Sequence, residues 1–462
     1  LEIVAAWGPL TGDYARAREQ IESAIAGRKH LREFSAWASL RGAVERSSLD
    51  GGRETVLAAR SEGPVAAARL RLGIRPAEQL DAVSLCKRAG GDPEQFVPTP
   101  NIALARWIEQ ASETAPREME ALRRACQSVK VRRVQDAGRP WWSALPFYAD
   151  VLLESQVAQV LDEAGYQGEL TAKQWFDRHV GPLLRHMREP HGYLAALVAD
   201  GDHMGRAIEH LRSPDEHRRF SEVLAGFAED ARAIVESRHR GELVYAGGDD
   251  VLAMVCPTDA LSCARELREA FRQRMGAFTA TCALPEVPTL SVGLGIAHRT
   301  EGLGDLVQLG REAEQLAKQP PEPHGEASRN ALAVIVTPRS GQRRSWRARW
   351  ADGQRCPVEQ LQRDMACTTL PMSKVHAIED MVRRLRGAEP AVLRGEVLRI
   401  LAHTADGAEK CSPQDVGLEL DLHGSSAVPL EVTIQRFVER QLVARVFSRA
   451  VQSTVPKQEH AR

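Results

Sequence analysis

Apolar residues between about 191 and 338 follow two alternating patterns. Mostly apolar runs, typical of buried strands, occur at 193–199, 289–298 and 331–336, and two further short runs form a predicted hairpin at 243–255. The helical period, with apolar residues every three or four positions, separates them at about 214–238, 258–275 and 303–318. The order of strand, helix, hairpin, helix, strand, helix and strand predicts an antiparallel-containing α/β sandwich of the ferredoxin-like or palm type.

Both flanks of this segment show the helical period. Upstream, it predicts helices within 14–34, 77–88, 101–127, 148–164 and 171–187. Downstream, it predicts helices near 358–368, 373–387, 390–404 and 429–452. The apolar start, Leu1 to Trp7, predicts a strand, and from it we expect the chain to begin partway through a fold. The whole pattern predicts an α+β protein, with the palm at 191–338 and mostly helical domains at 36–190 and 339–462.

Composition narrows the class of protein. At 462 residues the chain has room for several domains, and its formal net charge of −1 gives no global attraction to nucleic acid. No apolar run reaches the roughly 18 residues of a membrane helix and no signal-peptide pattern opens the chain, so we expect a soluble cytoplasmic protein without a membrane partner. The eight cysteines are scattered without metal-binding spacing, which argues against a structural zinc site.

Two acidic turns lie at the ends of predicted strands. Gly247-Gly248-Asp249-Asp250 is typical of a hairpin tip, and the first strand runs into Asp200-Gly201-Asp202. Because one helix separates the turns, the strand and the hairpin can bring both to the same edge of one sheet. Each turn alone is also an ordinary loop or helix start, so only their combination favours a functional site.

Carboxylates in such turns suit Mg²⁺ or Mn²⁺. Magnesium prefers oxygen ligands and is usually held by one or two carboxylates together with substrate phosphates. We predict Asp200 and Asp249 as the metal pair, and Asp250 as a second ligand or a brace, because neighbouring side chains alternate faces along a strand. Two carboxylates about 4 Å apart without a cation would repel by about 4 kcal/mol at an effective dielectric constant of about 20.

Two cations and one basic segment lie at or beyond the end of the helix predicted at 303–318. Lys318 and Arg329 can reach phosphate oxygens, although a solvated helix end whose cations suit the helix dipole is an equally good interpretation. Residues 339–350 interleave arginines with Trp346 and Trp350, a combination that serves phosphate contact and base stacking. The alternative for this segment is an ordinary basic linker whose tryptophans belong to the core.

With these residues assembled, the central segment is similar to the GGDEF-like palm domain of nucleotidyl cyclases. The two acidic turns, Ala317-Lys318 and Ser-Arg-Asn-Ala-Leu at 328–332 look specifically like the large subunit of type III CRISPR effector complexes, the Cas-ten family. The stretches 27–34, 47–56 and 78–88 agree with its Cmr-type branch. The family's His-Asp nuclease motif and its paired zinc-finger cysteines are absent from this sequence.

The resemblance implies a fold, an activity and a set of site residues. Two palm domains are implied, of which residues 1–35 would be the last part of the first. The implied activity is synthesis of cyclic oligoadenylates from ATP on target RNA binding, with a guide RNA and other subunits as partners. Asp200 and Asp249 would hold the metal and Asp250 would complete the motif. The nucleotide-binding residues would be Gly201, His203, Met204, Gly247, Gly248, Lys318 and Arg329, where the glycines let the backbone approach the triphosphate.

Two other functions compete with this interpretation. A stand-alone dinucleotide cyclase would act on GTP as a homodimer, which the long helical flanks disfavour. A scaffold subunit with an inactive or secondary palm would instead hold a guide RNA and neighbouring subunits, and the arginine and tryptophan segment at 339–350 motivates that role.

Overall fold

The computed structural model describes most of the chain between Val4 and Lys457. The described ranges are 4–10, 12–31, 45–49, 51–57, 69, 71–74, 78–90, 97–134, 140–319, 328–339, 342–350, 356–366, 370–402 and 429–457. They belong to two units, Leu1–Phe96 and Val97–Arg462, and each is described by itself. Within these ranges, no helix has both the length and the apolar character needed to cross a membrane. The domain boundaries expected at 35, 190 and 338 stay a prediction.

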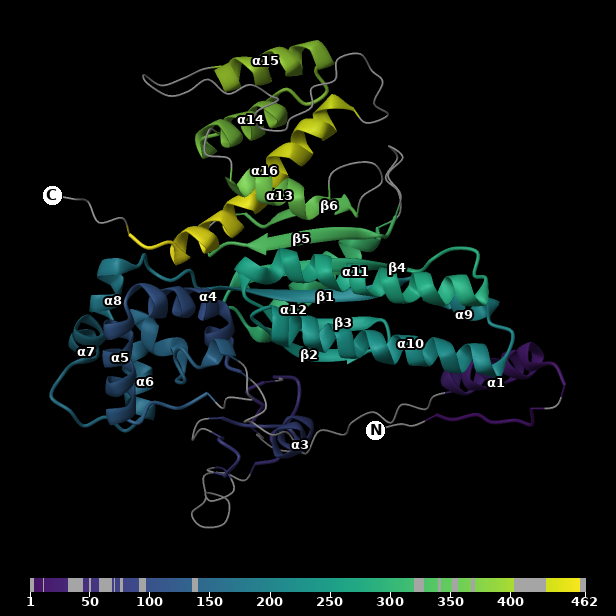
Figure 1. Ribbon diagram of the computed structural model, residues 1–462, viewed down its shortest axis with the longest axis horizontal. Coiled ribbons are helices and arrows are strands. Elements are labelled where there is room, and N and C mark those ends of the chain that lie inside the picture. Colours follow the sequence, from purple (N-terminus) through teal and green to yellow (C-terminus); the bar gives the residue numbers. More distant parts are fainter. Residues whose placement is uncertain are drawn as a thin grey trace. The chain divides into compact units, whose positions relative to one another are not determined.

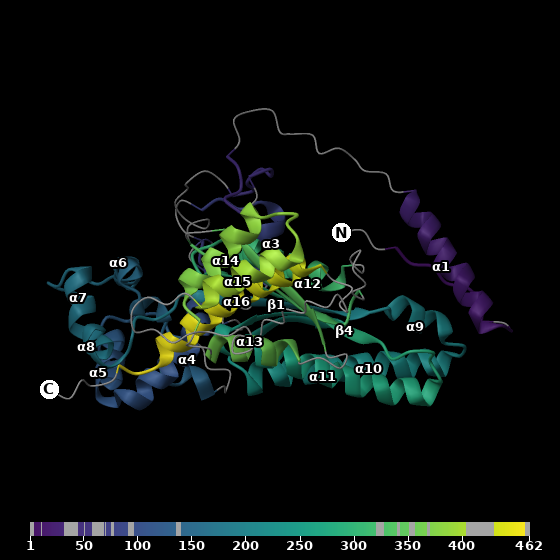
Figure 2. The same cartoon turned by 90° about the horizontal axis from the view of Figure 1, so that it is seen from above.

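The first unit contains two helices among its described residues, α1 (Tyr14–His30) and α3 (Ala82–Gly90) (Figures 1 and 2). Asp13 begins α1 by accepting a hydrogen bond from the backbone N–H of Ala15, at 2.9 Å. The strand predicted at Leu1 to Trp7 is not found: residues 4–7 have no regular structure, and 1–3 lie outside the described ranges. A strand requires a neighbour that pairs its N–H and C=O groups, and the described residues provide none there.

The second unit begins with a helical region. Its elements are α4 (Thr99–Thr114), α5 (Pro116–Ser128), the 3₁₀ turns η1 (Pro140–Trp142) and η2 (Ala149–Leu152), α6 (Glu154–Glu163), α7 (Ala172–His179) and α8 (Gly181–His186). The single helix predicted over 101–127 is in fact two, because Pro116 cannot donate a backbone hydrogen bond and therefore starts a new helix at its first position. Buried apolar side chains of this region form a core with one face of the sheet that follows.

Six strands form one sheet in the order β2-β3-β1-β4-β5-β6. The strands are β1 (Tyr193–Asp202), β2 (Gly241–Gly247), β3 (Asp250–Val255), β4 (Thr289–His298), β5 (Ala331–Thr337) and β6 (Arg344–Arg349). All neighbours are antiparallel except β4 and β5, which are parallel. The predicted strands are confirmed, although β1 runs beyond the predicted 193–199, to Asp202. The sheet, however, continues past the predicted end of the palm at 338.

Helices cover both faces of this sheet (Figure 1). Alternate residues of β1 face opposite sides: Ala195 and Leu197 pack with α10 (Pro214–Ala233) and α11 (Pro257–Cys282). Leu194 and Ala196 face α12 (Leu303–Lys318) and the helical region. The short helix α9 (Met204–His210) follows β1, and a π turn at Ile234–Arg238 ends α10.

Two glycines in β4 set the position of α12. A Cβ added to Gly293 would lie 2.1 Å from the backbone nitrogen of Glu314, and one added to Gly295 would lie 2.4 Å from that of Gly310. The backbones of helix and strand therefore touch, a contact that only glycine permits. This close approach sets the position of α12 against β4, and with it the position of Lys318, the last residue of α12.

The C-terminal part is helical, as predicted. It consists of α13 (Pro357–Ala366), α14 (Met372–Arg384), α15 (Pro390–Ala402) and the long α16 (Leu430–Thr454). One half of α16 packs with α14 and α15, while the other half lies along the sheet, so α16 joins two cores (Figure 1).

The segment 339–350 is neither a linker nor an exposed stacking surface, which corrects the sequence interpretation. It forms the edge strand β6, where Trp346 is buried, and Trp350 directly after it is buried as well. The side chain of Arg344 pairs with Glu379 and that of Arg343 with Glu312. Both indole rings are buried and therefore cannot stack on bases, so of the two interpretations of the tryptophans only the expectation that they belong to the core is confirmed.

Candidate metal centre

The hairpin between β2 and β3 presents Asp249 at its tip. Gly247 pairs with Asp250, which leaves Gly248 and Asp249 as a two-residue loop. Gly248 has a φ of 68°, as a type II′ turn requires at its first central position and as glycine adopts without strain. The run Gly-Gly-Asp-Asp thus builds the turn and places one carboxylate in it.

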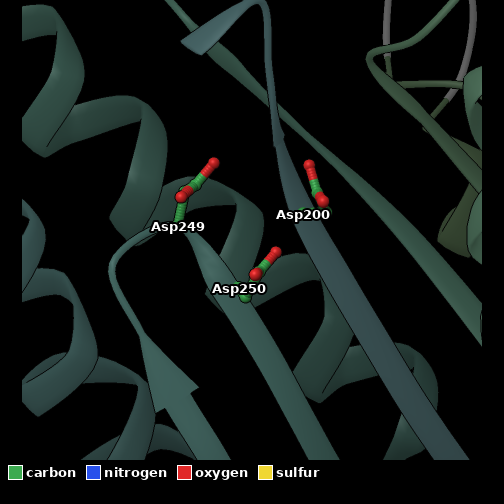
Figure 3. A group of neighbouring side chains, drawn as sticks. All are labelled: Asp200, Asp249 and Asp250. Atoms are coloured by element: carbon green, nitrogen blue, oxygen red, sulfur yellow. The ribbon is translucent and has the colours of Figure 1, made fainter. Parts of the chain in front are cut away.

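Three carboxylates converge beside this tip. Asp200, Asp249 and Asp250 each offer an oxygen, and these three oxygens lie within 4.8 Å of one another. Figure 3 shows Asp200 on β1 and the other two on the hairpin, with their carboxylates directed toward the same space. Asp249 lies in the turn and not in a strand, so the alternation of side chains along a strand does not separate it from Asp250, which was predicted as a second ligand or a brace.

Gly201 makes room for the hairpin tip. A Cβ at this position would lie 2.7 Å from Oδ2 of Asp249 and 2.8 Å from its Cβ. The middle residue of Asp-Gly-Asp therefore has to be glycine for β1 to approach Asp249. The sequence predicted this glycine for contact with a triphosphate, whereas its closest approach in the structure is to a carboxylate.

The crowding of these carboxylates changes their ionisation. Burial, together with a hydrogen bond to Asp200 and the negative charges of Asp200 and Asp249, raises the pKa of Asp250 to about 6. The pKa of Asp249 is also raised, first by burial and then by the charge of Asp200. Carboxylates that resist ionisation in this way gain from a bound cation, so the donor set fits a hard divalent metal.

Lys318 lies at the site, but its partners are carboxylates. Its ammonium group forms an ion pair with Asp200 and lies 3.2 Å from Glu314. Although burial opposes it, the hydrogen bond and charge of Asp200 raise the pKa of Lys318. The pair is only partly buried, with the Asp200 side chain 37% exposed, so Asp200 remains accessible to a further ligand. The predicted contact between Lys318 and phosphate stays a prediction.

Asp202 was not predicted as part of the site and acts as its brace. Its side chain is fully buried and accepts hydrogen bonds from the hydroxyl of Ser291, at 2.8 Å, and from the backbone N–H of Asn330, at 3.0 Å. It thereby ties β1 to β4 and to the start of β5. The spacing Asp200-x-Asp202 was the available signal, since both side chains share one face of β1.

A pocket of about 410 Å³ opens at this same end of the sheet. It contains the predicted His203 and Arg329, and it adds Arg206, His210 and Arg349, which were not predicted. The remaining lining residues are Ala207, Leu284, Pro285, Glu286, Val287, Pro288, Thr289, Ser328 and Asn330. Cationic groups thus outnumber the single acidic one, so the pocket favours an anion.

The predicted helix start at His203 and Met204 is present. His203 has a left-handed φ of 59° and precedes α9, and no side chain caps the first turn. Arg329 and Asn330 are also left-handed, with φ of 63° and 42°. The Nε atom of Arg329 lies 3.8 Å from Asp202, too far for a hydrogen bond, which leaves the guanidinium at the pocket wall.

Comparison with protein families identifies the central segment. Residues 193–333 match the model of Cas10/Cmr2, second palm domain. Over 179 residues the chain is 30% identical to the CRISPR system Cmr subunit Cmr2 of Pyrococcus furiosus, a match that covers 33% of this chain and 19% of that protein.

Solved structures support the same fold. The chain is similar to the cryo-EM structure of Type III-B Cmr-beta bound to cognate target RNA, with 14% identity, 87% of this chain and 58% of that chain covered, and a TM-score of 0.52. The crystal structure of a Csm1-Csm4 cassette in complex with cA4 is a weaker match, with 18% identity, 56% and 36% coverage and a TM-score of 0.31. The match thus spans less than two thirds of the length of each of these relatives. Residues 193–333 are thus similar to the second palm domain of the Cas10/Cmr2 family, the family that the motifs of the chain predicted.

Proposed function

We propose that this chain is the nucleotidyltransferase subunit of a type III CRISPR complex and joins ATP into cyclic oligoadenylates at the Asp200, Asp249 and Asp250 cluster. One observation carries the proposal: three carboxylates, one from β1 and two from the β2–β3 hairpin, meet within 4.8 Å in a segment that matches the second palm of Cas10/Cmr2. The resemblance to that family supplies the product class, which this cluster alone does not specify.

The reaction is adenylyl transfer. The 3′-oxygen of one ATP forms a bond to the α-phosphorus of another, the bond from that phosphorus to the bridging oxygen breaks, and pyrophosphate leaves while the hydroxyl proton passes to solvent. Mg²⁺ or Mn²⁺ held by Asp200, Asp249 and Asp250 would supply charge neutralisation for the phosphates. Little covalent chemistry falls to the protein, so positioning and electrostatics supply most of the acceleration.

The chain's own residues suit these tasks. The hairpin tip holds Asp249 in a rigid two-residue loop, and the absence of a side chain at Gly201 keeps β1 against it. Lys318 balances part of the negative charge through its ion pair with Asp200, and its flexible stem allows the ammonium group to transfer to a phosphate. Asp202 holds β4 and the 328–330 turn in register with β1.

The basic pocket is the nucleotide subsite of this proposal. It shares one end of the sheet with the carboxylates, since Asp202 pairs with Thr289 and Val292 pairs with Leu332. Arg329 and Arg349 line it from the turn before β5 and the end of β6, and guanidinium groups fit phosphate oxygens in a fork. Its volume of about 410 Å³ falls in the range of small-ligand sites.

The chain acts within a larger assembly in this proposal, with a guide RNA, a target RNA and further subunits as partners. The family match supports that role, and the helices that surround the palm offer surfaces for such contacts. The scaffold alternative loses its specific motive, because the tryptophans at 346 and 350 are buried and Arg343 and Arg344 are paired with glutamates.

The test uses the chain purified together with the proteins and RNA that co-elute with it. Asp249→Ala should abolish oligonucleotide formation from radiolabelled ATP in Mg²⁺ or Mn²⁺ and leave assembly intact. Asp177→Ala, an exposed carboxylate on α7, is the matched control and should retain full activity. Product formation by Asp249→Ala at the normal rate would refute the catalytic role. Turnover of GTP in preference to ATP would favour the dinucleotide cyclase instead.

A further inference from the structure

A second charged cluster lies at the opposite end of the sheet from the carboxylates. Tyr193, the first residue of β1, pairs across the strands with His298, the last residue of β4. Their rings meet edge to face, with centroids 5.4 Å apart, and His191 stacks on Tyr193 with centroids 4.5 Å apart. Three aromatic rings therefore stand side by side where the strands leave the core.

Arginines from three different elements surround these rings. The backbone N–H of Arg339, just after β5, donates to the Tyr193 hydroxyl at 3.0 Å, which places this residue beside the ring. Arg299 follows His298 directly, and Arg449 belongs to the part of α16 whose Ala450 and Ser453 line one pocket together with His191. The side chains of Arg339 and Arg449 are exposed.

Carboxylates offset only part of this charge. Asp150 pairs with Arg299 at 3.1 Å, and Glu163 is the further acidic group near Asp150. Arg299 is nonetheless short of a partner: its side chain is only 7% exposed, and its Nε has no hydrogen-bond partner among the described residues. Nδ1 of His191, which donates or accepts according to the tautomer, likewise has no hydrogen-bond partner among the described residues. Buried polar groups without partners are uncommon and mark places where a ligand can supply the partner.

The ionisation of the two histidines reflects the surplus of positive charge. Burial and the charges of Arg339 and Arg299 lower the pKa of His298, and burial with Arg449 and His298 lowers the pKa of His191 to about 4. Burial and the neighbouring Arg339 likewise lower the pKa of Arg299. A bound anion would relieve this repulsion.

We propose that Arg339, Arg449 and His298 form a phosphate-binding site for a single-stranded nucleic acid, with Arg299 behind them and the rings of Tyr193 and His298 beside them. Guanidinium groups with adjacent aromatic rings are the combination with which proteins hold single strands, the first on the phosphates and the second on the bases. An acidic peptide would need the cations but would leave the rings without a role. This site lies outside the proposed catalytic machinery and does not depend on it.

The test measures binding of a fluorescent oligouridylate to the full chain by anisotropy, across a series of salt concentrations. The double variant Arg339→Glu and Arg449→Glu should weaken binding by about tenfold or more. The slope of log affinity against log salt concentration should become shallower by about one to two, because two phosphate contacts are lost. The matched control, Arg178→Glu with Arg185→Glu, makes the same change in charge on exposed arginines of α7 and α8 and should change the affinity by less than about twofold. Equal weakening by both pairs would overturn the proposal.

Three further arms identify the ligand and guard against misfolding. The milder variant Arg339→Gln with Arg449→Gln should retain the wild-type melting temperature and still lose affinity. Inorganic phosphate should compete with the RNA only at far higher concentration than an unlabelled strand; equal competition would make this a site for free phosphate. The proposal would also be overturned if the chain bound polyglutamate in place of RNA and the variants weakened that binding to the same extent. The substituted residues all lie away from the Asp249 cluster, so ATP turnover should stay unchanged in every variant. A loss of RNA binding with normal ATP turnover therefore tests this site separately from the proposed function.

Discussion

Two side-chain clusters of opposite charge lie at the two ends of β1, the carboxylate cluster at its acidic end and the arginine and histidine cluster at its basic end. Where β1 ends, Asp200 meets Asp249 and Asp250, and the pKa values of the two hairpin carboxyls are raised. Where β1 begins, arginines gather around His298, and the histidine pKa values are lowered. Between these ends the strand is apolar and mostly buried. One physical effect, repulsion of like charges in a partly buried place, therefore acts with opposite sign at the two ends.

The difference between the ends lies in their internal counter-charge. Lys318 offsets one of three carboxylates at the acidic end, and Asp150 offsets one of several cations at the basic end. Within each cluster, the like charges outnumber the opposite charge that is paired with them. A divalent cation suits the first and phosphate groups suit the second, so the strand ends are fitted for ligands while the strand centres hold the fold together.

The largest expected effect is the loss of metal binding when the acidic end is neutralised. Asp200→Asn with Asp249→Asn removes two of three charged ligands, and we expect the affinity for Mn²⁺ to fall by at least about 100-fold, or about 3 kcal/mol. Titration calorimetry with Mn²⁺ measures this directly. Arg339→Gln, at the basic end, should leave the affinity unchanged, and an equal effect of both changes would show that the two ends are not independent.

The close approach of α12 to β4 is expected to be the next most sensitive feature. Gly293→Ala places a Cβ 2.1 Å from the backbone nitrogen of Glu314, so the helix that carries Lys318 must move. We expect a loss of about 2–3 kcal/mol in the free energy of unfolding, measured with urea. Gly276→Ala in α11 is the control: its Cβ meets nothing within 4 Å, so it should stabilise the protein by about 0.5–1 kcal/mol. Equal stability of the two variants would contradict this account.

Periodicity and turn residues predicted the palm well. The predicted bounds of strands β4 and β5 and of helix α12 agree with the structure to within about one residue, because each is a strongly patterned buried element bounded by turns. The convergence of Asp200 with Asp249 also followed from the sequence, because both acidic turns end strands of one sheet. Resemblance to a family then supplied the proposed substrate class, which periodicity alone does not carry.

Contacts between distant segments could not be predicted in the same way. Nothing local shows that Lys318 pairs with Asp200, or that Arg349 shares a pocket with His210. Residues 339–350 were misjudged because arginine-rich edge strands lack the alternation of apolar residues that marks a strand with one buried face. The pair Gly293 and Gly295 was the overlooked signal, since glycines inside an apolar strand indicate a close backbone approach.

A pH series should give opposite slopes at the two ends. At the acidic end, the pKa of Asp250 is raised to about 6, so protons compete with the cation below that pH and Mn²⁺ affinity should fall by up to about tenfold per pH unit. At the basic end, bound phosphate raises the lowered pKa of His298, so RNA affinity should rise as the pH falls from about 8 to about 6. Asp250→Asn should flatten the first profile and His298→Gln the second. If the affinities for Mn²⁺ and for RNA changed in the same direction with pH, the two clusters would not differ in the way proposed.

The smallest expected effect concerns the stability of the metal-free protein. The fold favours protonated Asp250, because its pKa of about 6 exceeds the ordinary value of 3.8; its stabilising contribution is complete below about pH 4 and is lost as the pH rises through about 6. In the presence of a chelator at about pH 7.5, Asp250→Asn should therefore raise the free energy of unfolding. Solvent screens this exposed side chain, so we expect a gain of about 1 kcal/mol, or about 2 °C in melting temperature. The gain should vanish at about pH 4.5, where the wild-type group is already protonated. Asp177→Asn should give no gain at either pH, and a gain for Asp250→Asn that persists in acid would mean that its cause is packing and not the repulsion that distinguishes this end of the sheet.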